Sequence, residues 1–272
     1  MTQPTPPALT DDQLAFFNAF GYVVRRNIFT PDELTTLRAE FDHMLAADYP
    51  HTPYDGSRRH WAMMMDEQTP FFASLMQDPR FLLPAQQMYG QDVLGICADA
   101  NRYTGHTDWH RDVVTVDQFG VKYAFYLDPV DADSGALRVI PTSHRLPDDD
   151  AFTQAVRAQP LDQVPATALA SNPGDVVAFD LRTFHASVGG STDRPMCTVV
   201  YYANPRTPRQ TEATKDIFAA SVKYGVDAFG PKRKFLYAKS YLANPRKDPV
   251  RQAWIDRLTE IGAYEAPGVV EI

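Results

Sequence analysis

Gly105-His106-Thr107-Asp108-Trp109-His110-Arg111-Asp112 is the segment that decides how this sequence is interpreted. His110 and Asp112 are two residues apart, and in an extended chain this spacing places both side chains on one face. An imidazole and a carboxylate can then converge on one point, which is half of a metal site. Far downstream, Thr183-Phe184-His185-Ala186-Ser187 supplies a second imidazole. Two histidines and one carboxylate leave up to three positions open on an octahedral ion, an arrangement typical of non-haem Fe(II) sites.

The composition of the 272-residue chain is that of a globular protein, with 44% hydrophobic and 22% charged residues. The net charge of −8 and the absence of a sustained basic stripe argue against a nucleic-acid partner. The sequence contains neither an apolar run of about 20 residues nor a signal-peptide pattern at its N-terminus. We therefore expect a cytoplasmic protein without a membrane partner.

The two cysteines are too few for a disulfide framework and are predicted to be buried thiols. The sequence gives no indication of the oligomeric state.

Short β-branched and aromatic runs separate the Gly, Pro, Asp and Asn clusters of the central part of the chain. This pattern predicts an all-β core of the sandwich or jelly-roll kind, whose two sheets can hold a ligand between them. The predicted strands span residues 93–103, 122–127, 136–140, 176–179 and 198–202.

Helical patterns flank this core on both sides. Thr10 and Thr30 are predicted to cap two N-terminal helices, the first of which ends at Gly21. A helical pattern between 70 and 89 is expected to be broken by two prolines, and residues 248–261 form a last predicted helix. The expected organisation is a flexible tail over 1–9 and a single domain over 10–272. Within this domain we predict a helical part (10–90), the β core (about 91–205) and a helical part (206–272).

Four blocks of the sequence occur in the order typical of one family. They are residues 109–112, the run Ser134-Gly135-Ala136-Leu137-Arg138-Val139-Ile140-Pro141-Thr142-Ser143-His144, Pro173-Gly174-Asp175, and Phe184 to Ser187 followed by Arg194. Together they resemble the phytanoyl-CoA dioxygenase-like family of Fe(II)- and 2-oxoglutarate-dependent oxygenases, over roughly residues 10–205. The resemblance implies a double-stranded β-helix (jelly roll, cupin-like) with flanking helices. In one departure from the pattern, Thr142 stands where the usual block has glycine.

The resemblance also assigns roles to individual residues. It implies that His110, Asp112 and His185 are the catalytic metal ligands and that Arg194 binds the distal carboxylate of 2-oxoglutarate. A planar guanidinium suits that role because it can bind a carboxylate through two parallel hydrogen bonds. Ser187 matches a hydroxyl beside that carboxylate, and Asn101 matches a polar residue near the co-substrate.

The implied reaction converts 2-oxoglutarate and O2 to succinate and CO2 while a C–H bond of a small molecule is hydroxylated. A carboxylate at Asp112 favours hydroxylation over halogenation, and we expect a role in secondary or phosphonate metabolism. Arg138 points opposite to its neighbours in the alternating run, so it either contacts an anionic substrate between the sheets or is solvated outside them. Two alternatives remain: a cupin-like metalloenzyme without 2-oxoglutarate, and a metal-free small-molecule binding protein of the same fold.

Overall fold

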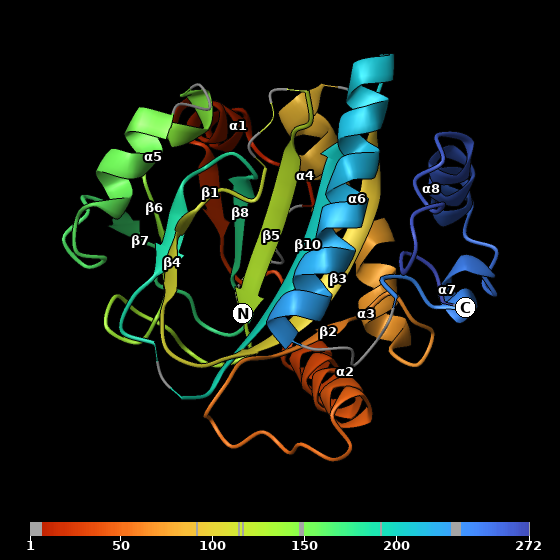
Figure 1. The fold of residues 1–272 in the computed structure, drawn as a ribbon, viewed down its shortest axis with the longest axis horizontal. Coiled ribbons are helices and arrows are strands. Elements are labelled where there is room, and N and C mark those ends of the chain that lie inside the picture. Colours follow the sequence, from red (N-terminus) through yellow and green to blue (C-terminus); the bar gives the residue numbers. More distant parts are fainter. Residues whose placement is uncertain are drawn as a thin grey trace.

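Two antiparallel β-sheets form the centre of the computed structural model (Figure 1). The structure describes residues 7–90, 92–113, 115, 117–146, 150–190, 192–229 and 235–271, without the side chains of 150 and 224–229. The larger sheet has the order β1-β8-β5-β10-β3-β2, and the smaller one has the order β4-β9-β6-β7. The strands are β1 (Tyr22–Arg25), β2 (His60–Met63), β3 (Val93–Tyr103), β4 (Thr107–His110), β5 (Gly120–Tyr126), β6 (Leu137–Val139), β7 (Thr167–Ala168), β8 (Val176–Asp180), β9 (His185–Ser187) and β10 (Arg194–Ala203).

The inner faces of the two sheets meet in one apolar cluster. It joins side chains of the larger sheet, such as Tyr126 and Phe179, to Leu137 and Val139 of the smaller one. The ring of Phe179 also lies 4.7 Å from the His185 ring on the opposite sheet. The predicted jelly-roll architecture, with two sheets facing each other, is therefore confirmed.

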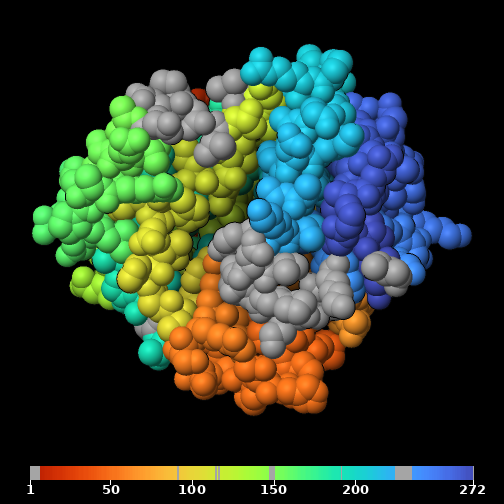
Figure 2. All heavy atoms as spheres, viewed as in Figure 1, coloured from red at the N-terminus to blue at the C-terminus, as the bar shows by residue number. Residues whose placement is uncertain are grey.

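Helices flank the sheets on several sides. They are α1 (Asp11–Phe20), α2 (Pro31–Asp48), α3 (Pro70–Ser74), η1 (Leu75–Gln77), α4 (Pro79–Tyr89), η2 (Ser143–Arg145), α5 (Asp150–Arg157), α6 (Pro208–Phe229), α7 (Lys239–Leu242) and α8 (Pro249–Glu260). Figure 1 shows α5 beside the smaller sheet and α8 on the far side of the larger one. The segment containing α2 and β2 (orange) covers one end of the molecule (Figure 2). None of the helices in the described ranges has the length and hydropathy of a transmembrane span.

The C-terminal helix packs directly on strand β3. Trp254 donates its indole N–H to the Val93 carbonyl at 3.0 Å. A Cβ at Gly95 would lie 2.6 Å from the Trp254 ring, so only glycine allows this close contact. Residues after 205 thus complete the outer cover of the larger sheet.

Both N-terminal helices begin and end as their sequences predict. Thr10 and Thr30 each form a capping box, with Gln13 and Glu33 as the reciprocal partners. Gly21 ends α1 with φ at 83°, and a Cβ there would lie 2.4 Å from His144 Nδ1. The chain is packed already at Leu9, which is buried and bonded to the Gln87 side chain, whereas residues 1–6 of the predicted tail lie outside the described residues.

The prediction that two prolines interrupt the helix at 70–89 is only half correct. Pro79 does begin α4, but Pro84 lies inside it. Proline cannot donate to the carbonyl four residues earlier, which here belongs to Arg80. The buried guanidinium of Arg25 donates to that carbonyl instead. The helix therefore continues because a side chain from β1 replaces the missing backbone donor.

Thr142 adopts the left-handed conformation that the usual glycine would adopt, with φ at 70°. Its side chain is exposed and makes no cap hydrogen bond that could offset the steric cost of Cβ. We expect Thr142→Gly to stabilise the protein by about 1 kcal/mol, after the greater unfolded-state entropy of glycine is subtracted. Thermal unfolding should show a rise in Tm of roughly 2–4 °C. Thr142→Ala, which keeps Cβ, is the control, and an equal gain from alanine would contradict the argument from φ.

Candidate active site

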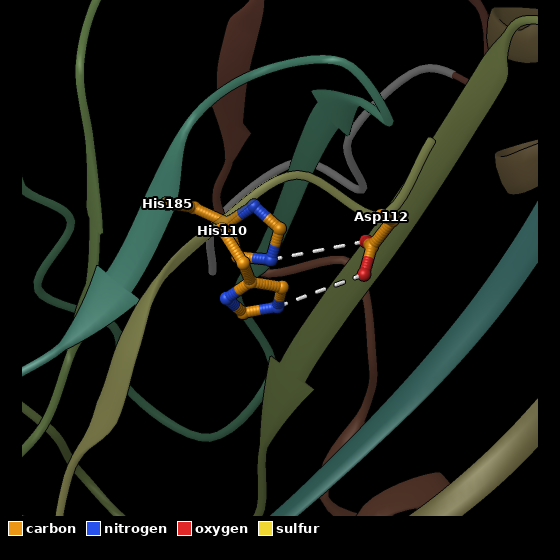
Figure 3. A group of neighbouring side chains, drawn as sticks. All are labelled: His110, Asp112 and His185. Atoms are coloured by element: carbon orange, nitrogen blue, oxygen red, sulfur yellow. Dashed lines mark ion pairs between the residues drawn. The ribbon is translucent and has the colours of Figure 1, made fainter. Parts of the chain in front are cut away.

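His110, Asp112 and His185 meet between the two sheets (Figure 3). His110 ends β4, His185 begins β9, and the two residues are cross-strand partners. Asp112 lies just beyond β4, where its backbone N–H donates to the Leu181 carbonyl at 3.0 Å. The carboxylate thus reaches the imidazoles from a bend after the strand and not from the strand itself. The donor atoms of all three residues lie within 4.8 Å of one another.

Both imidazoles are oriented by backbone carbonyls. His110 Nδ1 lies 2.7 Å from the Asp108 oxygen, and His185 Nδ1 lies 2.9 Å from the Thr183 oxygen. A nitrogen that faces a carbonyl must carry the proton, which leaves each Nε2 with a free lone pair. Each Nε2 is 3.8 Å from an Asp112 oxygen. These are the donor types and orientations that a divalent metal requires, so the residues fit an iron ion.

Charges around Asp112 keep it ionised. Burial alone would raise the pKa of the Asp112 carboxyl, but Lys122 and the two imidazoles hold it well below its usual range. The Lys122 ammonium lies 2.9 Å from Oδ2 and forms an ion pair with it. A role for Lys122 was not predicted from the sequence. The signal that could have indicated one is a charged residue within the otherwise apolar strand β5.

Arg194 and Ser187 meet on the same inner face. Arg194 is 3% exposed, and its Nη2 donates to Ser187 Oγ at 3.1 Å. Its Nη1 donates to the Gly105 carbonyl at 3.1 Å. A Cβ at Gly135 or Gly190 would lie 2.3 Å or 2.2 Å from the guanidinium, so both glycines leave room for it. A buried guanidinium held beside a hydroxyl can receive a carboxylate.

Asn101 lies on the inner face of β3, but its amide already has protein partners. Its oxygen accepts hydrogen bonds from two Arg59 nitrogens, and its Nδ2 donates to Asp99 Oδ1 at 2.8 Å. Asp99 also accepts from Trp61 Nε1 at 3.0 Å and Thr198 Oγ1 at 2.6 Å. The described contacts of Asn101 therefore make it part of a polar network on the larger sheet.

Arg138 is not brought together with the triad. Its cross-strand partner is Ala186, whereas Leu137 and Val139 pair with Ser187 and His185. Opposite residues share a face, so Arg138 points away from the side of the sheet that carries His185. Its Nη2 donates to the Ala132 carbonyl at 3.1 Å. Arg138 therefore lies on the outer face of the smaller sheet, which is the second of the two positions that the sequence allowed.

Two imidazoles and a carboxylate between the sheets of a jelly roll, with a buried arginine on the same face, define the class of Fe(II)- and 2-oxoglutarate-dependent oxygenases. Residues 17–196 match the family described as Phytanoyl-CoA dioxygenase (PhyH). The chain belongs to this family, as the resemblance of its sequence blocks predicted.

Curated relatives and solved structures agree with this assignment. Ectoine dioxygenase of Bordetella bronchiseptica is 22% identical over 233 residues, which cover 72% of this chain and 76% of the relative. Ectoine dioxygenase of Sphingopyxis alaskensis is 25% identical over 219 residues, which cover 67% and 72%. The structure of EctD from S. alaskensis with 2-oxoglutarate and 5-hydroxyectoine has a TM-score of 0.57 at 24% identity and covers 75% and 79% of the two chains. The carbocyclase SnoK from nogalamycin biosynthesis has a TM-score of 0.60 at 21% identity and covers 75% and 88%.

Burial of His185 makes the stability of the metal-free protein depend on pH. Burial and the neighbouring His110 lower the pKa of His185 to about 3, from an ordinary value of 6.5. The unfolded chain therefore binds a proton below pH 6.5 that the folded protein does not bind, so stability falls as the pH falls. Between pH 7 and pH 5 we expect a loss of up to about 2 kcal/mol from this residue. Urea unfolding of chelator-treated protein should show this loss in the wild type and a smaller one in His185→Gln; equal losses would contradict it.

Proposed function

We propose that this enzyme hydroxylates a C–H bond of a small molecule, with 2-oxoglutarate and O2 converted to succinate and CO2. In this proposal His110, Asp112 and His185 hold Fe(II), and Arg194 with Ser187 binds the distal carboxylate of 2-oxoglutarate. The observation that carries the proposal is that His185 and Ser187 lie on the same face of β9. His185 and Ser187 both point inward from it, so the metal donor and the co-substrate anchor lie two residues apart.

When bound, the iron would supply the activation of O2. The protein's own residues contribute orientation and charge. The backbone carbonyls at Asp108 and Thr183 hold both imidazoles with Nε2 directed to the metal position. The Arg194 guanidinium would bind a carboxylate through two nitrogens and so set the direction of the keto acid toward the triad. Burial of His185 and Arg194 keeps bulk water away from this contact.

The substrate class follows from the relatives only in outline. Curated relatives are named for ectoine, and two similar structures are an epimerase and a carbocyclase from nogalamycin biosynthesis. These names support a small organic substrate, and the nogalamycin enzymes favour secondary over phosphonate metabolism. We further propose that the enzyme is cytoplasmic and has no nucleic-acid or membrane partner; the net charge of −8 supports the absence of a nucleic-acid partner.

An anaerobic titration tests the proposal. Fe(II) and 2-oxoglutarate are added separately and together, while the visible charge-transfer band of the chelated keto acid is recorded. The band is expected only with both components. Iron binding without a band would favour the cupin-like metalloenzyme, and the absence of metal binding would favour the metal-free binding protein.

A further inference from the structure

Lys122 approaches the triad from the larger sheet. It is the cross-strand partner of Phe179, whose ring contacts His185. Directly opposite residues share a face, so Lys122 projects to the same inner side as the metal donors. Its Nζ lies 2.9 Å from Asp112 Oδ2, and each of these side chains is about one-fifth exposed, at 21% and 20%. An ammonium is thus placed beside the only carboxylate of the triad.

The position of Lys122 separates it from the anchor of the co-substrate. Lys122 pairs with Val200 of β10, and Arg194 lies six residues away on that strand (200 − 194 = 6). Six residues of strand correspond to about 20 Å of backbone. Arg194 lies at the start of β10, whereas Lys122 lies beside Val200 in the second half of that strand. Lys122 therefore lies apart from the guanidinium that would hold the co-substrate.

The acidic neighbour Asp99 does not replace Asp112 as the direct partner of Lys122. Three donors already bind the Asp99 carboxylate, from Trp61, Asn101 and Thr198. Burial alone would lower the pKa of Lys122, but Asp112 and then Asp99 raise it, so the ammonium is charged. A buried charge of this kind is tolerated only when it is paired. The direct contact with Asp112 is therefore the main interaction of this side chain.

We propose that Lys122 is a positioning residue of the metal centre, which holds Asp112 through Oδ2 and so fixes the orientation of this carboxylate toward the two imidazoles. The inference rests on the proposed function, because it takes His110, Asp112 and His185 as metal ligands. At 2.9 Å from Oδ2, the Lys122 ammonium acts on this carboxylate through its positive charge. A cationic replacement should therefore preserve the effect, whereas a neutral one should not.

Co(II) binding to the metal-free protein tests this inference without turnover. Lys122→Met is expected to bind Co(II) about 10–100-fold more weakly than the wild type, the range typical for residues that orient a metal ligand. Its visible ligand-field bands should shift, because the carboxylate is no longer held in one orientation. Lys122→Arg should keep the wild-type affinity and band positions. Lys215→Met is the matched control, because among the described residues Lys215 forms its ion pair with Glu212 of the same helix, α6, at 3.7 Å.

Two results would overturn the inference. One is a Lys122→Met protein whose affinity and bands equal those of the wild type. The other is tighter Co(II) binding by that variant, which would mean that Lys122 acts mainly as a competing cation. If Lys122→Met does not fold, Lys122→Gln takes its place, with the same expectation. Absence of Co(II) binding by the wild type would instead contradict the proposed function, so the two failures are distinguishable.

Discussion

Arg194→Ala should weaken 2-oxoglutarate binding by about 10²–10³-fold while leaving Co(II) or Fe(II) binding close to that of the wild type. The size follows from the loss of one partner of a buried, hydrogen-bonded charge pair, which costs about 2–5 kcal/mol. The guanidinium is buried, and it is already fixed by Ser187 and the Gly105 carbonyl. The guanidinium is therefore already held in position, so the full interaction is lost when the side chain is removed.

The measurement is the concentration of 2-oxoglutarate that half-saturates the charge-transfer band of the anaerobic Fe(II) protein. Arg194→Lys keeps the charge but loses the two-nitrogen geometry, so it should fall between the wild type and Arg194→Ala. Arg102→Ala is a suitable control, because Arg102 pairs with the half-exposed Asp193 near the end of β3. Unchanged saturation in Arg194→Ala would remove Arg194 from the co-substrate site and would favour the metalloenzyme without 2-oxoglutarate.

The triad was predictable because its residue types and their spacing occur in two short segments of the sequence. The two-residue spacing of His110 and Asp112 correctly indicated that their side chains converge. It gave the wrong local reason, since β4 ends at His110 and Asp112 follows in a bend held by Leu181.

Strand β3 was predicted with its observed bounds, whereas β10 begins at Arg194, four residues before its predicted start. Pro195 conceals this beginning, because a proline within an apolar run usually argues against a strand. The four-residue strand β2 was also not predicted, since it is defined by its pairing with β3, whose partner residues lie 36 to 42 positions later (His60 with Arg102 through Met63 with Asp99). Short strands of this kind depend on a non-local partner and carry too few residues for a periodic signal.

The contacts around the triad were the least accessible from sequence. Lys122 and Asp112 are close because β5 and β8 pair in one register and the two sheets face each other. A shift of one residue in that register would turn Lys122 to the opposite face. Arg138 illustrates the same limit. The alternating sequence showed that its side chain lies on the opposite face of the strand from Leu137 and Val139, but not which of the two faces is directed between the sheets. Only the pairing of Val139 with His185 decides this.

Asp112→Ala should abolish hydroxylation and weaken metal binding more than any change around the ligands. We expect the loss of metal affinity to exceed the roughly 100-fold limit typical of residues that only orient ligands. Two neutral imidazoles would remain, and they cannot neutralise the charge of a divalent ion. Asp108→Ala is the matched control, because Asp108 lies two residues before His110 and its carboxylate is 88% exposed. Wild-type metal binding by Asp112→Ala would show that another donor supplies the carboxylate.

The same substitution should also destabilise the metal-free protein, because it leaves the Lys122 ammonium beside the triad without its direct partner. Removing one member of a fully buried pair costs about 3–5 kcal/mol, and the partial exposure of this pair reduces the expected loss to about 1–2 kcal/mol. The double variant Asp112→Ala/Lys122→Met should recover much of this stability, since no unpaired charge remains, yet it should still fail to bind metal. Urea unfolding with chelator present measures the first effect, and Co(II) titration measures the second. Equal stability of the single and double variants would mean that Asp99 alone suffices to pair Lys122, and the close Lys122–Asp112 contact would then contribute little to the fold.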